Sequence, residues 1–583
     1  MTASNARRRS LKRAVGAIAL IAGPMAMQVA GAQAQSFNTV IAVEQRMAQP
    51  DYGAVGLDIA LDANGALVSE GMWEGMTRRR AATLMTMAGQ QTGIAALDTL
   101  YMQTLAVAAG SPRRDEEREA EATGNAWLEA RVSSLVARGH YDAAVKLGDR
   151  LGTAGRAANP VVERDLLNAV LWGQGLGPAC AVSWRLEAQA RTGSDPELQL
   201  LDAACKAHKG DRAAAEFAAE LASELGAGNS TAINLLDHMI GLHRGKPKPK
   251  LLKTAASDPL SFAMAGALNM DWPVALYDQL PAAVLAGFAS RADISLPNRI
   301  VAAELARASG FGTRNQLRDL YMQAAAALAA GEVTPTQASA AILDRANSFA
   351  TWRQSQDPVI GADQLADLLA RSQAQGRFDV MADLLLHDFS FPQAEATLSK
   401  HAGIFARAAM AANMPNRAGT WLAILLKGQE AGVFFLDPNV RAVWPLLILS
   451  KLPVNEMVEN GALPWLASLS EEDRPKAALV FSMAEALGRR VPEPAWLTLQ
   501  DGATPDVDAA ALPPLPYWRG IAAAASRGSR AEVIIFANLL LQTNRDELAH
   551  PAIISSVLSA LRGIGATDIA HQIAVETALK VGF

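Results

Sequence analysis

The side chains that most often perform catalysis are sparse along this chain and are not spaced as catalytic or metal sites require. The eight histidines are scattered. His238 and His243 are five residues apart, one more than the same-face spacing of a helical zinc motif, and no glutamate follows His238. His387 directly precedes Asp388, but neighbouring residues of a helix do not face each other. We therefore expect neither metal ligands nor a histidine–carboxylate pair.

Two glycine-rich segments imitate nucleotide-binding loops without completing them. Residues 173–178 follow the dinucleotide pattern until Pro178 replaces the third glycine, and a helix-like stretch precedes them where a strand is required. Residues 241–246 are one residue short of a phosphate-binding loop and run into Pro247. The sequence also lacks a Gly-x-Ser-x-Gly nucleophile motif. These observations predict no catalytic residue and no cofactor, and they favour a protein that is not an enzyme.

The chain has two cysteines, Cys180 and Cys205, whose placement predicts a disulfide. Gly193 indicates a helix end, and Asp195 followed by Pro196 indicates the capped start of the next helix. Cys180 precedes Gly193 by 13 residues and Cys205 follows it by 12, so the two thiols lie at the same height in an antiparallel helical hairpin. Such a crosslink contributes about 3 kcal/mol in the chain-entropy model. The alternative is a pair of free cysteines buried in a helical core.

The N-terminal residues have the composition of a bacterial export signal. A basic stretch precedes the apolar residues 14–29, and the small residues that follow end in an A-x-A site. We expect cleavage between Ala34 and Gln35 and a periplasmic mature protein in a Gram-negative bacterium; a secreted or envelope-associated protein is an alternative. No stop-transfer charges follow, which disfavours a retained membrane anchor. Arg8 and Arg9 partly fit a twin-arginine signal, and the general secretory route fits as well.

The composition indicates an all-α protein. Half of the residues are hydrophobic but only 5% are aromatic, and the excess is mostly alanine and leucine. Alanine is the strongest helix former and lets helices approach closely. The formal charge of −5 is small for 583 residues, and no long basic tract is present. We therefore expect no nucleic-acid partner.

Five glycine-centred turns each precede an Ala/Leu-rich amphipathic helix. They lie at Gly139, Gly210, Gly376, Gly528 and Gly565. A small-residue turn followed by such a helix resembles tetratricopeptide-type repeats. Because the intervals are not regular multiples of 34 residues, we predict a degenerate tetratricopeptide-like helical-hairpin solenoid behind the cleaved signal peptide. A set of unrelated helical hairpins is the alternative.

The helix expected at 211–226 shows the amphipathic pattern most clearly. Phe217 shares one apolar ridge with Ala213, Leu221 and Leu225, and three alanines form the adjacent ridge. The charged residues fall on the other face, so these two ridges together form the predicted apolar face.

Composition also changes along the chain and predicts six segments. Residues 244–253 are basic and alternate with proline, which indicates an extended, solvated linker. Residues 490–516 contain too many prolines for a helix. The predicted segments are a signal peptide 1–34, an N-terminal helical-repeat region 35–243, the basic linker 244–253, a central helical-repeat region 254–489, the Pro-rich linker 490–516 and a C-terminal helical segment 517–583.

Two surfaces are candidates for contact with other molecules. Trp496, Tyr517 and Trp518 flank the Pro-rich linker, whose stiff backbone loses little entropy on docking, and they are the predicted partner-binding residues. A packed linker is the alternative. The basic linker permits weak contact with anionic lipid head groups or cell-wall polymer, although a plain solvated linker is favoured. Its basic residues are Arg244, Lys246, Lys248, Lys250 and Lys253.

Several stretches carry a likeness to a known family. They are WLEARVSSLVARGHYDAAVKL from Trp127, GLGPACAVSW from Gly175, DAACKAHKGDRAAAEFAAELASELG from Asp202, PLPYWRGIAAAASRGSRAEVI from Pro514 and VLSALRGIGATDIAHQIAVETAL from Val557. Their order resembles uncharacterised exported Ala/Leu-rich helical-repeat proteins of alphaproteobacteria. The resemblance spans most of the mature chain through packing and turn motifs, so it implies architecture and compartment and no activity.

These features together predict a non-enzymatic periplasmic helical-repeat protein that binds another protein and serves as a scaffold or adaptor in the cell envelope. A peptidoglycan-processing enzyme, or its superhelical accessory subunit, is the first alternative. An oligomeric structural envelope protein is the second.

Overall fold

A computed structural model describes most of the chain after residue 54. The described residues are 55–58, 67–108, 110–115, 120–157, 159–182, 195–227, 230–241, 250–251, 253–427, 437–454, 456–501, 514–542 and 550–583. Side chains are described for these residues except 120–125, 153–157, 254–255 and 457. Ala34 and Gln35 lie outside the described residues, so the signal peptide and its cleavage site stay predictions.

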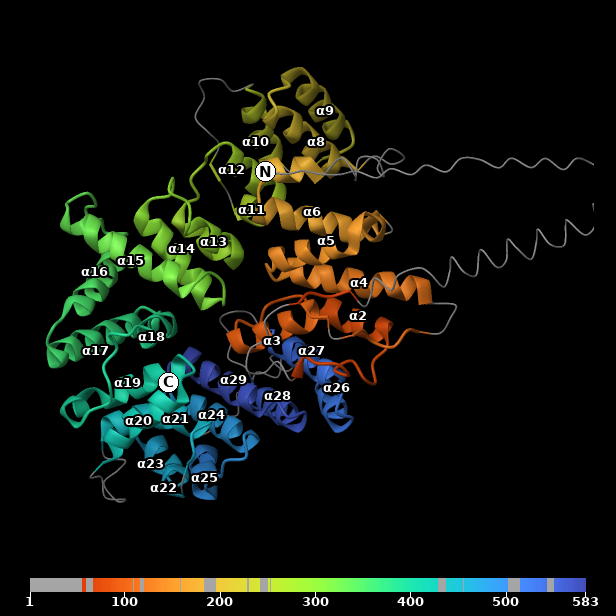
Figure 1. Cartoon of the computed structure of the whole chain (residues 1–583). Coiled ribbons are helices and arrows are strands. Elements are labelled where there is room, and N and C mark those ends of the chain that lie inside the picture. Colours follow the sequence, from red (N-terminus) through yellow and green to blue (C-terminus); the bar gives the residue numbers. More distant parts are fainter. Residues whose placement is uncertain are drawn as a thin grey trace, which may run out of the picture. The chain divides into compact units, whose positions relative to one another are not determined.

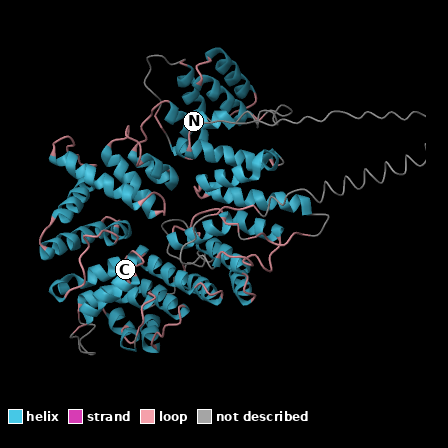
Figure 2. Ribbon diagram, in the orientation of Figure 1, coloured by secondary structure: helices cyan, strands magenta, loops and turns pink. Residues whose placement is uncertain are grey.

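The described chain is all-α, which confirms the predicted fold class (Figures 1 and 2). Its β contacts are two isolated bridges, between Leu57 and Val107 and between Thr77 and Arg113. Both bridges hold extended segments against the ends of helices. The helices of the first half are α2 Arg78–Met87, α3 Ala95–Ala106, α4 Ala120–Ala137, α5 Tyr141–Ala157, α6 Pro160–Gly173, α8 Pro196–His208, α9 Arg212–Glu224, α10 Ser230–Ile240, α11 Lys253–Ala256, α12 Pro259–Ala267, η3 Val274–Gln279 and α13 Ala282–Phe288.

The remaining helices continue the same pattern of short elements joined by tight turns. They are α14 Leu296–Ala308, α15 Arg314–Ala329, α16 Ala340–Gln354, α17 Pro358–Ala374, α18 Phe378–Leu386, η4 Ala396–His401, α19 Ala402–Ala411, α20 Pro415–Leu426, α21 Pro438–Leu449, α22 Glu456–Glu459, α23 Ala462–Ala467, α24 Arg474–Ala486, α25 Glu493–Asp501, α26 Leu515–Ser526, α27 Arg530–Leu541, α28 Pro551–Gly563 and α29 Thr567–Lys580.

The five predicted glycine turns are confirmed, and one hydrogen-bond pattern explains them. Each glycine has a positive φ, between 64° and 84°, and the next helix begins two residues later. At Gly210 the glycine N–H donates to the carbonyl of Ala207, and the N–H of Asp211 donates to the carbonyl of Lys206, both at 3.0 Å. This pair of bonds ends a helix and requires a left-handed residue, which glycine adopts without strain.

Asparagine takes the place of glycine at two further turns of the same kind. Asn269 and Asn413 have φ values of 49° and 52°. After Asn269, the N–H of Met270 donates to the carbonyl of Ala265 at 3.0 Å, as the residue after glycine does elsewhere. Asparagine tolerates this conformation better than other residues with a Cβ. A search for glycine alone therefore underestimates the number of hairpin turns.

Prolines begin many of the helices, so they act as start signals. Pro196, Pro259, Pro358 and Pro438 each occupy the first helical position, after an aspartate whose carboxylate accepts from a backbone N–H of the first turn. Proline has no backbone N–H, but an N–H at the first helical position has no acceptor within the helix. Proline at this position therefore removes no hydrogen bond from the helix. The predicted start at Asp195 and Pro196 is confirmed, with Glu197 N donating to Asp195 Oδ1 at 3.0 Å.

Helices adjacent in the sequence usually contact each other. The pairs α5 and α6, α8 and α9, α15 and α16, and α19 and α20 have extensive contacts. Buried apolar residues from Leu57 to Val581 form one continuous hydrophobic cluster. The described helices thus share a core.

The last helices also contact the first described ones. Helix α27 contacts α2 and α3, and α29 contacts α3, as the blue and orange-red helices in Figure 1 show. The N–H of Ala531 donates to the carbonyl of Met72 at 3.0 Å. The fully buried carboxylate of Glu532 pairs with Arg80, which is 452 residues away in the sequence. Helices therefore contact not only their neighbours in the sequence but also, at the two ends of the described chain, helices that are far away in the sequence.

The two predicted apolar ridges of helix α9 differ in burial. Ala215, Ala218 and Ala222 are buried, whereas Phe217 is 69% exposed. Its contacts are with α8 and α10, and alanine side chains allow α8 to approach closely. The ridge that contains Phe217 is exposed at Ala213 and Phe217 and half-buried at Leu221 and Leu225, so the predicted apolar face is only partly covered.

The prediction that 490–516 is too proline-rich for a helix is wrong for its described residues. Helix α25 covers Glu493–Asp501, and α26 begins at Leu515. Pro494 and Pro516 are each the second residue of their helix, where the missing N–H has no intrahelical partner.

The basic linker is described only at its end. Lys250 and Lys253 are exposed, and Lys253 begins α11 rather than lying in an extended segment. Arg244, Lys246 and Lys248 lie outside the described residues, so their solvation and any lipid contact stay predictions.

The region Tyr52–Phe583 forms one compact unit, and the other unit, Met1–Asp51, lies outside the described residues. Helices on the two sides of each predicted linker contact each other. Helix α10 contacts α12 across 244–253, and α24 contacts α28 across 490–516. The predicted segment boundaries at these linkers stay predictions.

Candidate functional site

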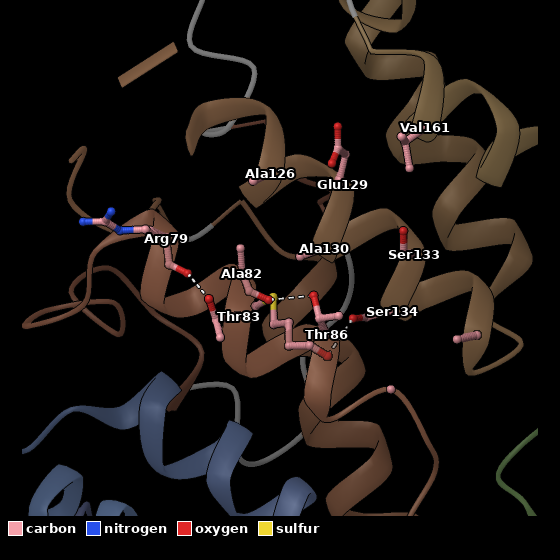
Figure 3. A pocket seen from close by; sticks show the side chains of 13 residues that line it. Arg79, Ala82, Thr83, Thr86, Ala126, Glu129, Ala130, Ser133, Ser134 and Val161 are labelled. Carbon is pink, nitrogen blue, oxygen red and sulfur yellow. Dashed lines mark hydrogen bonds between the residues drawn. The ribbon is translucent and has the colours of Figure 1, made fainter. Parts of the chain in front are cut away.

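A groove lies between α2, α4 and the first turn of α6 (Figure 3). Its volume is about 580 Å³. Most of the side chains that line it are apolar or small, and the charged ones are Arg79 on α2 and Glu129 on α4. The other lining residues are Ala82, Thr83, Met85, Thr86, Gly89, Ala126, Ala130, Ser133, Ser134, Ala137 and Val161.

The α2 wall of the groove is largely apolar because its hydroxyl groups bond within the helix. Thr83 Oγ1 donates to the carbonyl of Arg79, and Thr86 Oγ1 donates to the carbonyl of Ala82, both at 2.9 Å. Such bonds one turn back are common for threonine in helices and satisfy the hydroxyl without a partner from outside. The exposed Thr83 and Thr86 side chains therefore need no further polar contact from a molecule in the groove.

The α4 wall consists of small residues that recur at one-turn spacing. Ala126, Ala130 and Ala137 line the groove. The neighbouring Trp127 on α4 is fully buried and meets Trp73 edge to face at a centroid distance of 4.8 Å. Trp127 thus anchors α4 to the core, while the small residues that line the groove leave room for the close approach of a further helix.

Acidic groups gather at the edge where α4 faces α6. Ser133 Oγ donates to a carboxylate oxygen of Asp165 on α6. Burial raises the pKa of Asp165, the hydrogen bond from Ser133 opposes this, and the nearby Glu129 carboxylate raises the pKa further. Among the described residues, Glu129 has no hydrogen-bond or ion-pair partner. This edge of the groove therefore favours a cation.

The buried cation Arg131 has a structural role. The Arg131 side chain on α4 donates to the carbonyl oxygens of Leu105 at 2.8 Å and Val55 at 2.7 Å. Burial, followed by repulsion from Arg78, lowers the pKa of Arg131 to about 10. Arg131 thereby ties the extended residues near Val55 to α3 and α4, and it is not free to contact a molecule in the groove.

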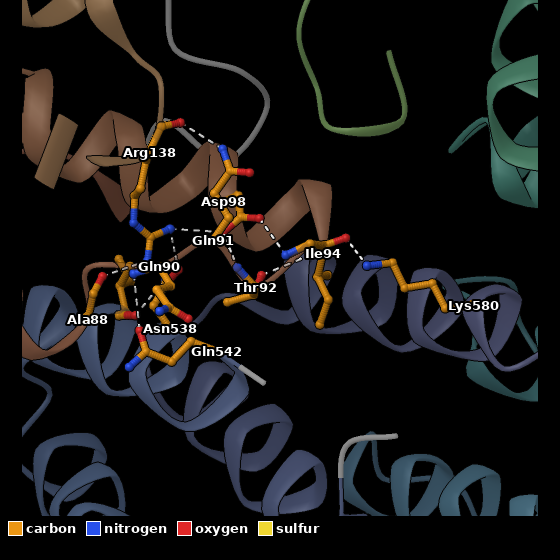
Figure 4. A network of polar contacts seen from close by, with 12 residues as sticks. Ala88, Gln90, Gln91, Thr92, Ile94, Asp98, Arg138, Asn538, Gln542 and Lys580 are labelled. Carbon is orange, nitrogen blue, oxygen red and sulfur yellow. Dashed lines mark hydrogen bonds and ion pairs between the residues drawn. The ribbon is translucent and has the colours of Figure 1, made fainter. Parts of the chain in front are cut away.

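A second polar cluster joins α3, α4 and α27 (Figure 4). Arg138 Nη1 lies 2.9 Å from Asp98 Oδ1 and 3.2 Å from Asn538 Oδ1, and Arg138 Nη2 donates to the carbonyl of Ala88 at 2.8 Å. The guanidinium also lies 4.1 Å from the centroid of the Tyr101 ring. These interactions pair the buried charge and bond both terminal nitrogens, while Arg138 Nε has no hydrogen-bond partner in the described part of the chain. The cluster holds the ends of the chain together rather than exposing reactive groups.

A third buried cluster lies between α14, α15 and α16. Arg345 Nη2 contacts Glu304 Oε2 at 2.7 Å, and Tyr321 donates to Glu304 Oε1 at 2.6 Å. Burial, reinforced by the Glu304 charge, raises the pKa of Tyr321 well above its ordinary value. Since these groups are buried and bonded to one another, they too have a structural role.

The two cysteines are joined in the structure. Cys180 and Cys205 form a disulfide with a Cα–Cα distance of 5.5 Å. Cys205 is buried in α8, and Cys180 is half-buried in the helical residues 176–182. Gly193, where the sequence places the helix end, lies outside the described residues.

The three predicted partner-binding residues are half-buried and bonded within the chain. Trp496 Nε1 donates to Glu485 Oε1 at 3.0 Å, and Trp518 Nε1 donates to Ser556 Oγ at 2.6 Å. The Tyr517 hydroxyl lies 3.7 Å from Met87 Sδ. All three rings pack against the hydrophobic core. These contacts favour the alternative of a packed segment, and a partner-binding role for the three residues stays a prediction.

The structure describes two of the sequence motifs that were rejected as functional sites. His387 Nδ1 lies 2.9 Å from the carbonyl oxygen of Asp383, whereas Asp388 pairs with Arg353 at 3.1 Å, so His387 and Asp388 do not face each other. Helix α6 ends at Gly173, and Gly175 has a φ of 86°, so residues 174 and 175 form a short turn before the helical residues 176–182. Within the described residues, no group of three or more His, Cys, Asp or Glu side chains is placed to hold a metal ion.

Comparison of the chain with protein-family models, with curated proteins and with solved structures finds no significant match in any of the three. The resemblance to exported alphaproteobacterial proteins therefore stays a prediction. None of the helices in the described part of the chain is long and apolar enough to cross a membrane.

Sequence reasoning missed the groove. The available signal was the spacing of small residues on α4, at Ala126, Ala130 and Ala137. This spacing marks a close helix contact, but it does not show whether α2, α6 or another molecule makes that contact.

Proposed function

We propose that this protein is a degenerate tetratricopeptide-like helical-repeat protein, exported behind a cleaved signal peptide, that binds another protein as a scaffold or adaptor in the cell envelope. The observation that carries the proposal is the groove between α2, α4 and α6, which has mostly apolar walls and an acidic edge. Such grooves commonly accept helical segments of partner proteins.

The recurring hairpins support the repeat part of this proposal. Helices end at left-handed glycine or asparagine residues, and the next helix often starts within two residues. Stacked hairpins of this kind present extended surfaces, whose usual role is protein recognition. The link from architecture to function is an analogy, and it needs a direct test.

The test is crosslinking in living cells of the native host, followed by purification of the tagged full-length protein from the envelope. We expect one protein to copurify in a fixed ratio and the mature N-terminus to be Gln35. Purification of this chain alone after crosslinking would contradict the proposal. Clearing of a purified peptidoglycan suspension would instead favour the enzyme alternative, and a large homo-oligomer in light scattering would favour the structural one.

A further inference from the structure

The residues that line the groove indicate what kind of partner segment it binds. This inference rests on the proposed function. We propose that the groove of α2, α4 and α6 binds an amphipathic helix of another protein, and that a lysine or arginine on this helix contacts Glu129 and Asp165. The groove matches such a helix in its dimensions, in the composition of its walls and in the charge at its edge.

The dimensions fit a helix of about three turns. The lining residues on α4 extend from Ala126 to Ala137, which corresponds to roughly 16 Å at 1.5 Å per residue. A helix of this length directs three or four side chains, at positions i, i+3 or i+4 and i+7, toward one groove.

The walls favour apolar contact at short distance. Ala82 and Met85 on α2 and Ala130 and Ser134 on α4 are buried at the floor, and the exposed Val161 extends the apolar surface at the start of α6. The threonine hydroxyls on α2 are bonded to their own helix. A strand would find no free sheet edge here, whereas a helix hydrogen-bonds its own backbone and needs only apolar burial.

The charge selects a basic residue on the partner. Glu129 has no ion-pair partner among the described residues, and the nearby Asp165 carboxylate receives its hydrogen bond from Ser133. A cation placed between the two carboxylates lowers their mutual repulsion, and the apolar surroundings strengthen the attraction. Figure 3 shows Arg79 on α2, away from Glu129 on α4. The edge thus determines which side of the partner helix faces α6.

The test places a photocrosslinking amino acid, p-benzoylphenylalanine, at position 83 of the full-length protein in its native host. Thr83 is exposed and lines the groove, so the probe reaches an occupant without a change to the core. We expect a crosslink to another protein, within a segment that has apolar residues at helical spacing and a lysine or arginine on the flanking face.

Charge variants then test the acidic edge. Glu129→Lys replaces attraction by repulsion and should lower the crosslink yield by roughly tenfold or more, and Glu129→Gln should lower it less. The matched control is Glu220→Lys, which makes the same charge change on the exposed face of α9 and should leave the yield unchanged. Circular dichroism and thermal melting of each variant check that a lower yield does not reflect unfolding.

Several outcomes overturn the inference. They are a crosslink to this chain itself or to a second copy, a crosslink to a segment without helical apolar spacing, and a yield that Glu129→Lys leaves unchanged. A protein that copurifies but crosslinks only at other surfaces overturns the groove assignment and leaves the proposed function standing. If no protein copurifies at all, the proposed function fails first.

Discussion

At the scale of single residues, Arg138 is a fully buried cation whose partners come from both ends of the chain. Its side chain is fully shielded from solvent, and Asp98, Asn538 and the carbonyl of Ala88 bond its two terminal nitrogens. Burial lowers the pKa of Arg138, while Tyr101 and Asp98 raise it. A buried ion pair of this kind gains little over an apolar pair, but removal of one partner is costly because the other stays in the core.

We expect Arg138→Met to lower the free energy of unfolding by about 3–5 kcal/mol, as measured by urea denaturation. The reason is that Asp98 loses its cationic partner and Asn538 loses a donor. The control is Arg212→Met, which removes an exposed ion pair with Glu216 on α9 and should cost less than about 0.5 kcal/mol. Similar losses in the two variants would contradict a special role for Arg138.

The titration of His140 makes the stability of the folded protein depend on pH. Its ring stacks on Phe311 at a centroid distance of 5.0 Å, and burial, followed by repulsion from Arg138, lowers the pKa of His140 from 6.5 to about 4. The unfolded chain therefore takes up this proton first as the pH falls. The stability that the neutral ring contributes is present above pH 6.5 and is lost as the pH falls toward about 4.

Between about pH 7 and pH 4.5, the wild type should therefore lose about 2 kcal/mol more stability than His140→Phe, which keeps the ring contact without the titration. Urea denaturation of both proteins at the two pH values measures the difference. If the two proteins lose equal stability, the ring of His140 is solvated in the folded state and this interpretation is wrong.

At the scale of the elements, the hairpin turns depend on residues that accept a positive φ. Gly210 has a φ of 84°, and a Cβ built there would meet no atom within 4 Å. Gly266, inside α12, also has free space around it but has no positive φ. The two glycines therefore differ in backbone conformation and not in crowding.

Gly210→Ala should destabilise the protein by about 1–2 kcal/mol, because alanine is strained in the left-handed region. Gly266→Ala should instead stabilise it by up to about 1 kcal/mol, because alanine is the better helix former. Thermal unfolding of the two variants measures both changes. Shifts of the same sign would show that the turn geometry does not limit stability.

The disulfide is a second feature at the scale of the elements that stabilises the fold. It joins Cys205 in α8 to Cys180 across 25 residues of sequence. Protein isolated under oxidising conditions and denatured without reductant should show no titratable thiol. The double variant Cys180→Ala/Cys205→Ala should lose about 3 kcal/mol of stability in the chain-entropy model. Two free thiols in the denatured wild type would favour the alternative of buried free cysteines.

At the scale of the whole molecule, the contacts of α27 and α29 with α2 and α3 couple the distant ends of the chain. We expect Ile573→Ala, which creates a cavity in α29, to speed amide hydrogen exchange in α3 as well as in α29. Leu365→Ala in α17 makes a comparable cavity far along the sequence and should leave exchange in α3 unchanged. Equal effects on α3 would indicate that the described chain unfolds as one cooperative unit.

Local signals in the sequence were sufficient for the fold class and for many helix boundaries. Alanine and leucine favour helices everywhere, Asp195 followed by Pro196 caps α8, and the glycines at 139, 210, 376, 528 and 565 require turns. Each of these effects acts within about six residues, so the surrounding structure has little influence on it. The same reasoning was wrong for Pro494 and Pro516, because a proline favours or breaks a helix according to its position within the turn.

Only the tertiary structure decided which apolar faces are covered. The side of α9 with Phe217 is exposed, the small-residue side of α4 borders a groove, and the rings of Trp496, Tyr517 and Trp518 pack inward. Likewise, Glu532 and Arg80 are 452 residues apart in sequence and show no pattern that pairs them. Burial depends on which helices meet, and that choice is made by the summed packing of the whole chain, so local spacing supplies the candidate faces but cannot select among them.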